Sequence, residues 1–79
     1  MNVEEKEQLV NNILQITEKY LEYCNEKRTP FVCELKNKKG GVDKIKQFVL
    51  NRCLNTPDMP VGRAIQEMEK TLNPIYVDF

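Results

Sequence analysis

The segment VDKIKQFVLNRCL, residues 42–54, constrains the fold of this chain more than any other. At 100° per residue, its apolar side chains spread over roughly two-thirds of a helical wheel, and only Lys44, Gln47 and Asn51 form a continuous polar strip. A helix with so wide an apolar arc needs neighbours on several sides. We therefore expect a central helix over residues 42–54. Its large aromatic residue, Phe48, is expected to be buried so well that Phe48→Ala costs about 3–5 kcal/mol.

An amphipathic pattern over residues 3–24 predicts a second long helix. Its apolar positions, among them Ile13, Ile16 and Tyr20, take up about half of the wheel, and polar residues fill the other half. Glutamates near its start suit the positive end of the helix dipole. The apolar half is expected to face the core.

Two further helices are predicted at residues 30–36 and 60–72. Thr29 and Pro30 suit the N-cap and first position of a short helix, although residues 31–35 also have an extended alternative. The loop KNKKGG at residues 36–41 separates this helix from the central one, and its glycines permit positive φ. In the last helix the apolar stripe consists of Val61, Ala64, Ile65, Met68 and Leu72. Gly62 beside this stripe is small enough for another helix to approach closely.

The predicted fold class is therefore all-α: a small single-domain orthogonal bundle of three main helices plus one short helix. The 79 residues form one domain, with helices at about 3–24, 30–36, 42–54 and 60–72 and an apolar tail at 74–79. No stretch approaches the roughly 18 apolar residues of a membrane span. The polar start MNVEEKEQ does not resemble a secretory signal.

Three cysteines and no histidine argue against a metal site or a cofactor. No two cysteines have a CxxC spacing, and their odd number without a secretion signal makes a disulfide framework unexpected. We expect Cys24, Cys33 and Cys53 to be buried free thiols in a reduced, cytoplasmic protein.

Catalysis is not expected from this composition. The chain has no serine and no histidine, so Ser-His and Cys-His triads cannot form within it. It also lacks a phosphate-binding loop of the GxxxxGK[ST] type. Glu67 and Glu69 are two residues apart on a helix, so they face different directions and are expected to be solvated.

Basic side chains gather in the middle of the chain, where residues 27–52 hold eight basic and two acidic groups. Residues 1–26 hold six glutamates against two lysines, so the basic segment has two interpretations. It either complements the acidic first helix or binds nucleic-acid phosphates. The candidate nucleic-acid contacts are Lys36, Lys38, Lys39, Lys44 and Lys46.

The tail sequence IYVDF is unusually apolar for a terminal segment. Its large side chains either cover the open end of the bundle or form a docking segment for a partner. The candidate docking residues are Ile75, Tyr76, Val77 and Phe79. The sequence thus favours a non-catalytic protein–protein interaction module that binds a protein partner or a second copy of itself, without metal or membrane. The alternative is a nucleic-acid-binding module that uses the basic region Lys36–Lys46.

Overall fold

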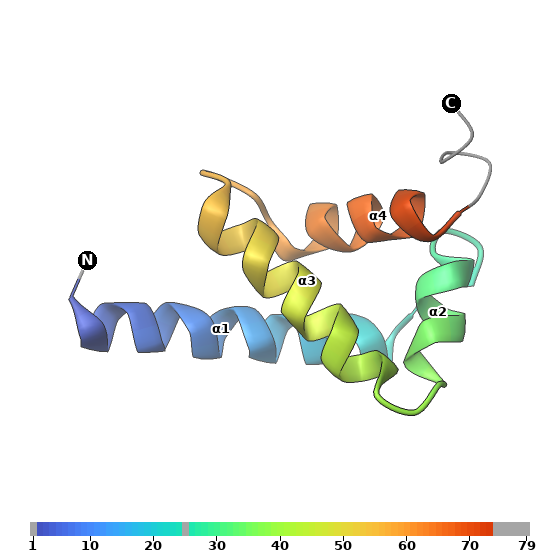
Figure 1. Cartoon of the computed structure of the whole chain (residues 1–79), viewed down its shortest axis with the longest axis horizontal. Coiled ribbons are helices and arrows are strands. Elements are labelled where there is room, and N and C mark those ends of the chain that lie inside the picture. The colour runs from blue at the N-terminus through green and yellow to red at the C-terminus, as the bar shows by residue number, and fades with distance from the viewer. Residues whose placement is uncertain (1, 25, 74–79) are drawn as a thin grey trace.

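The computed structural model describes residues 2–24 and 26–73, and this part of the chain forms four α-helices and no strand (Figure 1). The helices are α1 (Val3–Glu22), α2 (Pro30–Lys36), α3 (Gly41–Asn55) and α4 (Val61–Leu72). The prediction of a small all-α fold with three main helices and one short helix is confirmed. The candidate docking residues Ile75, Tyr76, Val77 and Phe79 lie outside the described residues, so both interpretations of the tail stay predictions.

Helices α3 and α4 share the centre of the fold, because each of them contacts all three other helices. Ile45 and Val49 of α3 and Ala64 of α4 are completely buried. Phe48 is only partly buried and packs against this cluster, which corrects the expectation that it is well buried. Ile45 and Val49 are four residues apart and form one line on α3, and this line points between the neighbouring helices.

The start of α2 depends on a side chain from α4. Thr29 occupies the N-cap position and Pro30 the first helical position, as predicted, but the Thr29 side chain makes no cap hydrogen bond. The Glu69 carboxylate accepts hydrogen bonds from the backbone N–H groups of Phe31 (3.0 Å) and Val32 (2.8 Å) instead. Glu69 is only 7% exposed, which corrects the expectation that it is solvated. The first N–H groups of a helix have no acceptor within it, and this carboxylate supplies one.

The turn between α2 and α3 uses its two glycines differently. Gly40 has φ 75°, which is the left-handed conformation that favours glycine. At Gly41 the backbone comes so close to α2 that a Cβ atom would lie 1.7 Å from the carbonyl oxygen of Leu35. The glycine pair therefore sets the angle at which α3 leaves α2.

A disulfide joins Cys24 at the end of α1 to Cys33 in α2. This corrects the expectation of three free thiols. The two Cα atoms are 6.0 Å apart, which is a normal separation for a disulfide. Cys53 is the free cysteine and is partly buried. No helix in the described part of the chain is long and apolar enough to cross a membrane.

Candidate interaction surface

Two apolar residues of α1 that the sequence assigns to the core are exposed. Ile16 is 44% exposed and Tyr20 is 50% exposed, whereas Ile13, Thr17 and Leu21 on the neighbouring side of α1 are buried. The structure shows why the expectation fails. This side of α1 faces α4, and the two helices come close where the Tyr20 ring lies against Gly62. Helix α4 therefore covers Ile16 and Tyr20 only in part. A Cβ atom on Gly62 would lie 2.7 Å from Oη of Tyr20.

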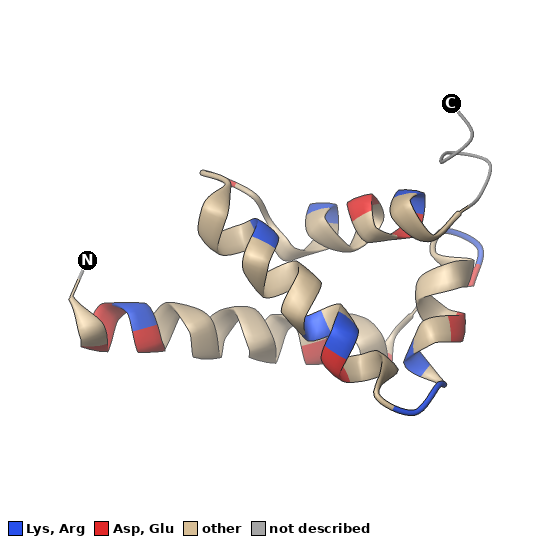
Figure 2. Cartoon of the chain, viewed as in Figure 1, with Lys and Arg blue, Asp and Glu red and all other residues tan. Residues whose placement is uncertain are grey.

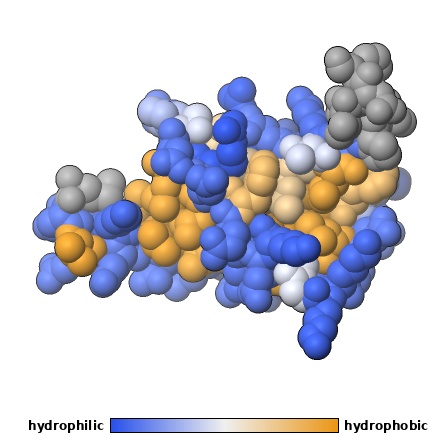
Figure 3. Space-filling view, viewed as in Figure 1, coloured by the Kyte–Doolittle hydropathy of each residue, from blue (hydrophilic) through white to orange (hydrophobic). Residues whose placement is uncertain are grey.

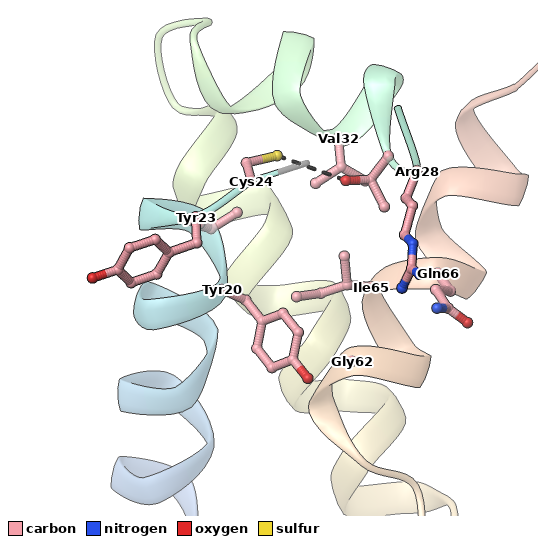
Figure 4. Close-up of a pocket in the computed structure, with 10 residues that line it drawn as sticks. Tyr20, Tyr23, Cys24, Arg28, Val32, Gly62, Ile65 and Gln66 are labelled. Atoms are coloured by element: carbon pink, nitrogen blue, oxygen red, sulfur yellow. Dashed lines mark hydrogen bonds between the residues drawn. The ribbon is translucent and has the colours of Figure 1, made fainter. Parts of the chain in front are cut away.

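A hollow of about 220 Å³ lies between α1, α2 and α4 on one side of this contact. In Figure 4 the Tyr20 ring points toward Gly62, the Tyr23 ring points away from α4, and Val32 and Ile65 lie between the helices. Arg28 and Gln66 provide polar groups at its edge. Thr29 lines it as well, with its hydroxyl 3.7 Å from Sγ of Cys24. We call this space the Arg28 hollow.

A second, more open hollow lies on the other side of the Tyr20–Gly62 contact. It measures about 450 Å³, and its apolar lining includes Leu9, Ile13, Ile16, Met59 and Val61. We call it the Met59 hollow, and the two hollows together form the α1/α4 groove. Gly62 lies where the sequence suggested a close helix approach, but the neighbour is the ring of an exposed tyrosine.

The middle of α1 is free of charge. Residues 8–17 contain no acidic or basic side chain, and Figure 2 shows this stretch as an uninterrupted tan segment between charged ends. Its four exposed polar residues are asparagines and glutamines, and together with Glu4 and Glu7 they line a shallow hollow. Depletion of charge is the compositional feature that distinguishes the centre of protein interfaces from the rest of a surface.

A fourth hollow lies between α1 and α3 and is lined by Leu9, Leu50 and Leu54 together with polar residues. On the face shown in Figure 3, apolar side chains gather along α1 beside the C-terminal half of α3 and again between α3 and α4. Leu54 is 37% exposed. Apolar side chains therefore border α1 on the side of α3 as well as on the side of α4.

The five lysines proposed as nucleic-acid contacts are divided between partly buried and exposed positions. Nζ of Lys36 donates a hydrogen bond to the carbonyl oxygen of Leu21, and Lys46 forms an ion pair of 2.8 Å with Glu18. Both lysines thus contact α1, Lys46 through the carboxylate of Glu18 and Lys36 through a backbone carbonyl. Lys38 lies 3.9 Å from Glu34 in an exposed pair. Lys39 and Lys44 are exposed and form no ion pair within the described ranges.

The carboxylates and the free thiol that could take part in catalysis have structural roles or are partly buried. Glu67 pairs with Arg52, with 2.6 Å between Oε2 and Nη2, and Glu69 binds the start of α2. Burial raises the pKa of the Cys53 thiol, so less of the nucleophilic thiolate is present near neutral pH. No cluster of metal-ligating residues occurs among residues 2–24 and 26–73.

Sequence reasoning missed three features of this region: the cap by Glu69, the disulfide and the exposure of Ile16 and Tyr20. The run of uncharged residues at 8–17 is the signal that could have indicated an exposed apolar surface on α1. Comparison of the chain with known protein families, with curated proteins and with solved structures finds no match.

Proposed function

We propose that this protein is a non-catalytic protein–protein interaction module that binds through α1 and the α1/α4 groove. The observation that carries the proposal is the exposure of Ile16 and Tyr20 on a helix whose centre has no charge. Exposed apolar groups on a small domain, bordered by polar ones, are typical of surfaces that bind another protein.

The shape of the groove supports the same function. The Tyr20 ring divides the groove into two hollows, and an apolar side chain from a partner fits into each of them. Tyrosine suits such a position because it offers a large rigid apolar surface and a hydroxyl group. Arg28 and Gln66 add polar groups that can orient a partner at one end.

The cellular compartment is a separate question. The cytoplasmic location expected from the sequence stays a prediction. The Cys24–Cys33 disulfide argues for an oxidising compartment, because cytosolic reductants keep most thiols reduced. The proposed binding surface does not include the disulfide sulfurs as reactive groups, so the proposal holds in either compartment.

Photo-cross-linking in cells that naturally make the protein tests the proposal. A photoreactive phenylalanine analogue replaces Ile16 in one variant and Asn11, on the opposite side of the same uncharged stretch, in a control variant. We expect adducts from position 16 that are absent from position 11, and we expect Tyr20→Glu to abolish binding of the identified protein to the purified module. Equal adducts from both positions, or none from position 16, would refute the proposed function.

A further inference from the structure

Six residues form a stripe along the outer side of α1, five of them within the helix and Tyr23 at its C-cap. Glu5, Asn12 and Lys19 follow one another at seven-residue spacing, and so do Leu9, Ile16 and Tyr23. Seven residues make nearly two full helical turns, so each set points in almost one direction. The two sets are neighbours on the helix surface because they are offset by four residues. Leu9 is partly buried and the other five are exposed, Tyr23 by 82%. We call these six residues the outer stripe.

The charges of the outer stripe are symmetric about Asn12. Glu5 precedes Asn12 by seven residues and Lys19 follows it by seven, so each lies about 10 Å from it along the helix axis. Neither Glu5 nor Lys19 forms an ion pair with another described residue. The stripe therefore has one negative end, one positive end and a neutral middle.

We propose that the outer stripe pairs in antiparallel orientation with the same stripe of a second copy of this chain. A two-fold axis at Asn12 places Glu5 of each copy beside Lys19 of the other, and it brings Leu9 beside Ile16. The two Asn12 amides meet at the axis, where each can both donate and accept a hydrogen bond. A parallel pairing would instead place Glu5 against Glu5 and Lys19 against Lys19, which is repulsive.

The whole molecule is compatible with this pairing. Its formal net charge is zero, so two copies do not repel one another at long range. The stripe is roughly 27 Å long and one helix wide, which gives less than the ~800 Å² per partner of a typical stable complex. The dimer is therefore weak, with Kd in the range of about 10–500 µM. This inference rests on the proposed function, because it names the partner of the same helix.

Sedimentation equilibrium of the full chain from about 10 µM to about 1 mM at low ionic strength measures the dimer directly. Ile16→Glu puts a charge beside the axis and is expected to raise Kd at least about tenfold. Asn11→Glu, which adds the same charge to the opposite side of α1, is the matched control and is expected to leave Kd within about threefold. Circular dichroism of each variant shows whether the helices are retained.

A charge exchange tests the antiparallel register. Glu5→Lys alone opposes lysine with lysine, and Lys19→Glu alone opposes glutamate with glutamate, so each variant is expected to dimerise about tenfold more weakly. An equimolar mixture of the two restores opposite charges at both ends and is expected to dimerise at least as tightly as the unmodified chain. Glu7→Lys and Lys44→Glu carry the same net charges outside the stripe, so mixing these two controls is expected to give no gain.

Three results would overturn the inference: a monomer at every concentration, a dimer that Ile16→Glu leaves unchanged, or charge-exchange variants that stay apart when mixed. Its failure differs from failure of the proposed function. Adducts from position 16 to a different protein, with a chain that is monomeric up to about 1 mM, leave the proposed function intact and exclude the second copy. Absence of any adduct from position 16 together with a monomeric chain refutes both.

Discussion

At the scale of single residues, Glu69 is the side chain on which α2 depends most directly. It brings a negative charge into a site that is 7% exposed, and its two oxygens accept from Phe31 and Val32. Glu69→Ala leaves both N–H groups without this acceptor and is expected to lower the free energy of unfolding by about 2–3 kcal/mol. Glu69→Gln keeps one acceptor oxygen and should lose about half as much.

Urea denaturation followed by circular dichroism measures both losses. The matched control is Glu67→Ala on the same helix, since Glu67 pairs with Arg52 at a partly exposed position. That substitution is expected to cost less than about 1 kcal/mol. Equal losses for Glu67→Ala and Glu69→Ala would contradict the role given to the buried cap.

The size of the loss at Ile45 and Phe48 depends on burial rather than on side-chain volume. Ile45 is completely buried between the helices, and Phe48 is partly buried at the edge of the cluster. Ile45→Ala is expected to cost about 3–4 kcal/mol, and Phe48→Ala about 2 kcal/mol, less than the sequence suggests. Thermal and urea unfolding of the two variants measures which substitution costs more stability. A larger loss at Phe48 would show that α3 turns a different side to the core.

At the scale of elements, the α2–α3 turn requires glycine at both positions, for unequal reasons. Gly40→Ala keeps open space around the new methyl group but forces a residue with a side chain to φ 75°, at about 1 kcal/mol. Gly41→Ala places Cβ against the backbone of Leu35, which cannot move without displacing α2. We expect a loss of more than about 2 kcal/mol at Gly41. Equal losses in the free energy of unfolding for Gly40→Ala and Gly41→Ala would contradict this distinction.

The elements also show how much a single sequence can predict. The apolar stripe of α4 is correctly predicted, and Val61, Ala64, Ile65 and Met68 are all buried. The prediction succeeds because neighbouring helices cover most of this side of α4, so the apolar positions of the pattern are also the buried ones. In α1 the same periodicity fails at Ile16 and Tyr20, since a helical wheel shows which side is apolar but not how far a neighbour covers it. Glu69 and the cysteine pair depend on where α2 lies against α1 and α4, and local spacing carries no information on that.

At the scale of the whole molecule, the contacts of the five candidate lysines determine how strongly the protein can bind nucleic acid. Lys36 and Lys46 contact α1, and Lys38 has a carboxylate nearby, so few basic groups remain for phosphates. Weak contacts of this kind are screened by salt. We expect the protein to elute from heparin at or below about 0.15 M salt, with Lys39→Gln and Lys44→Gln removing any retention at lower salt. Retention well above that salt concentration would support the nucleic-acid alternative.

Helix α2 is held to the rest of the fold by a small number of specific links. Helices α1 and α2 contact one another little, and α2 packs mainly on α3 and α4. Three links fix its position: the Glu69 cap, the hydrogen bond from Lys36 to the carbonyl of Leu21, and the disulfide. Of these links, only the disulfide connects α1 to α2 covalently across the intervening loop.

Replacing both Cys24 and Cys33 by serine removes that covalent link without adding bulk. Closing a loop with a sequence separation of nine residues restricts the unfolded chain, so its loss is expected to lower the free energy of unfolding by about 2–3 kcal/mol. Urea unfolding of the original chain with and without dithiothreitol should reproduce the same difference, while Cys53→Ser should respond to the reductant as the original chain does. Cys24 and Val32 line the Arg28 hollow beside α2. Because reduction removes the covalent link that holds α2 there, the reduced protein should also show faster amide exchange in α2 than in α3. Equal stability and equal exchange in the two redox states would mean that packing on α3 and α4 alone holds α2 in place.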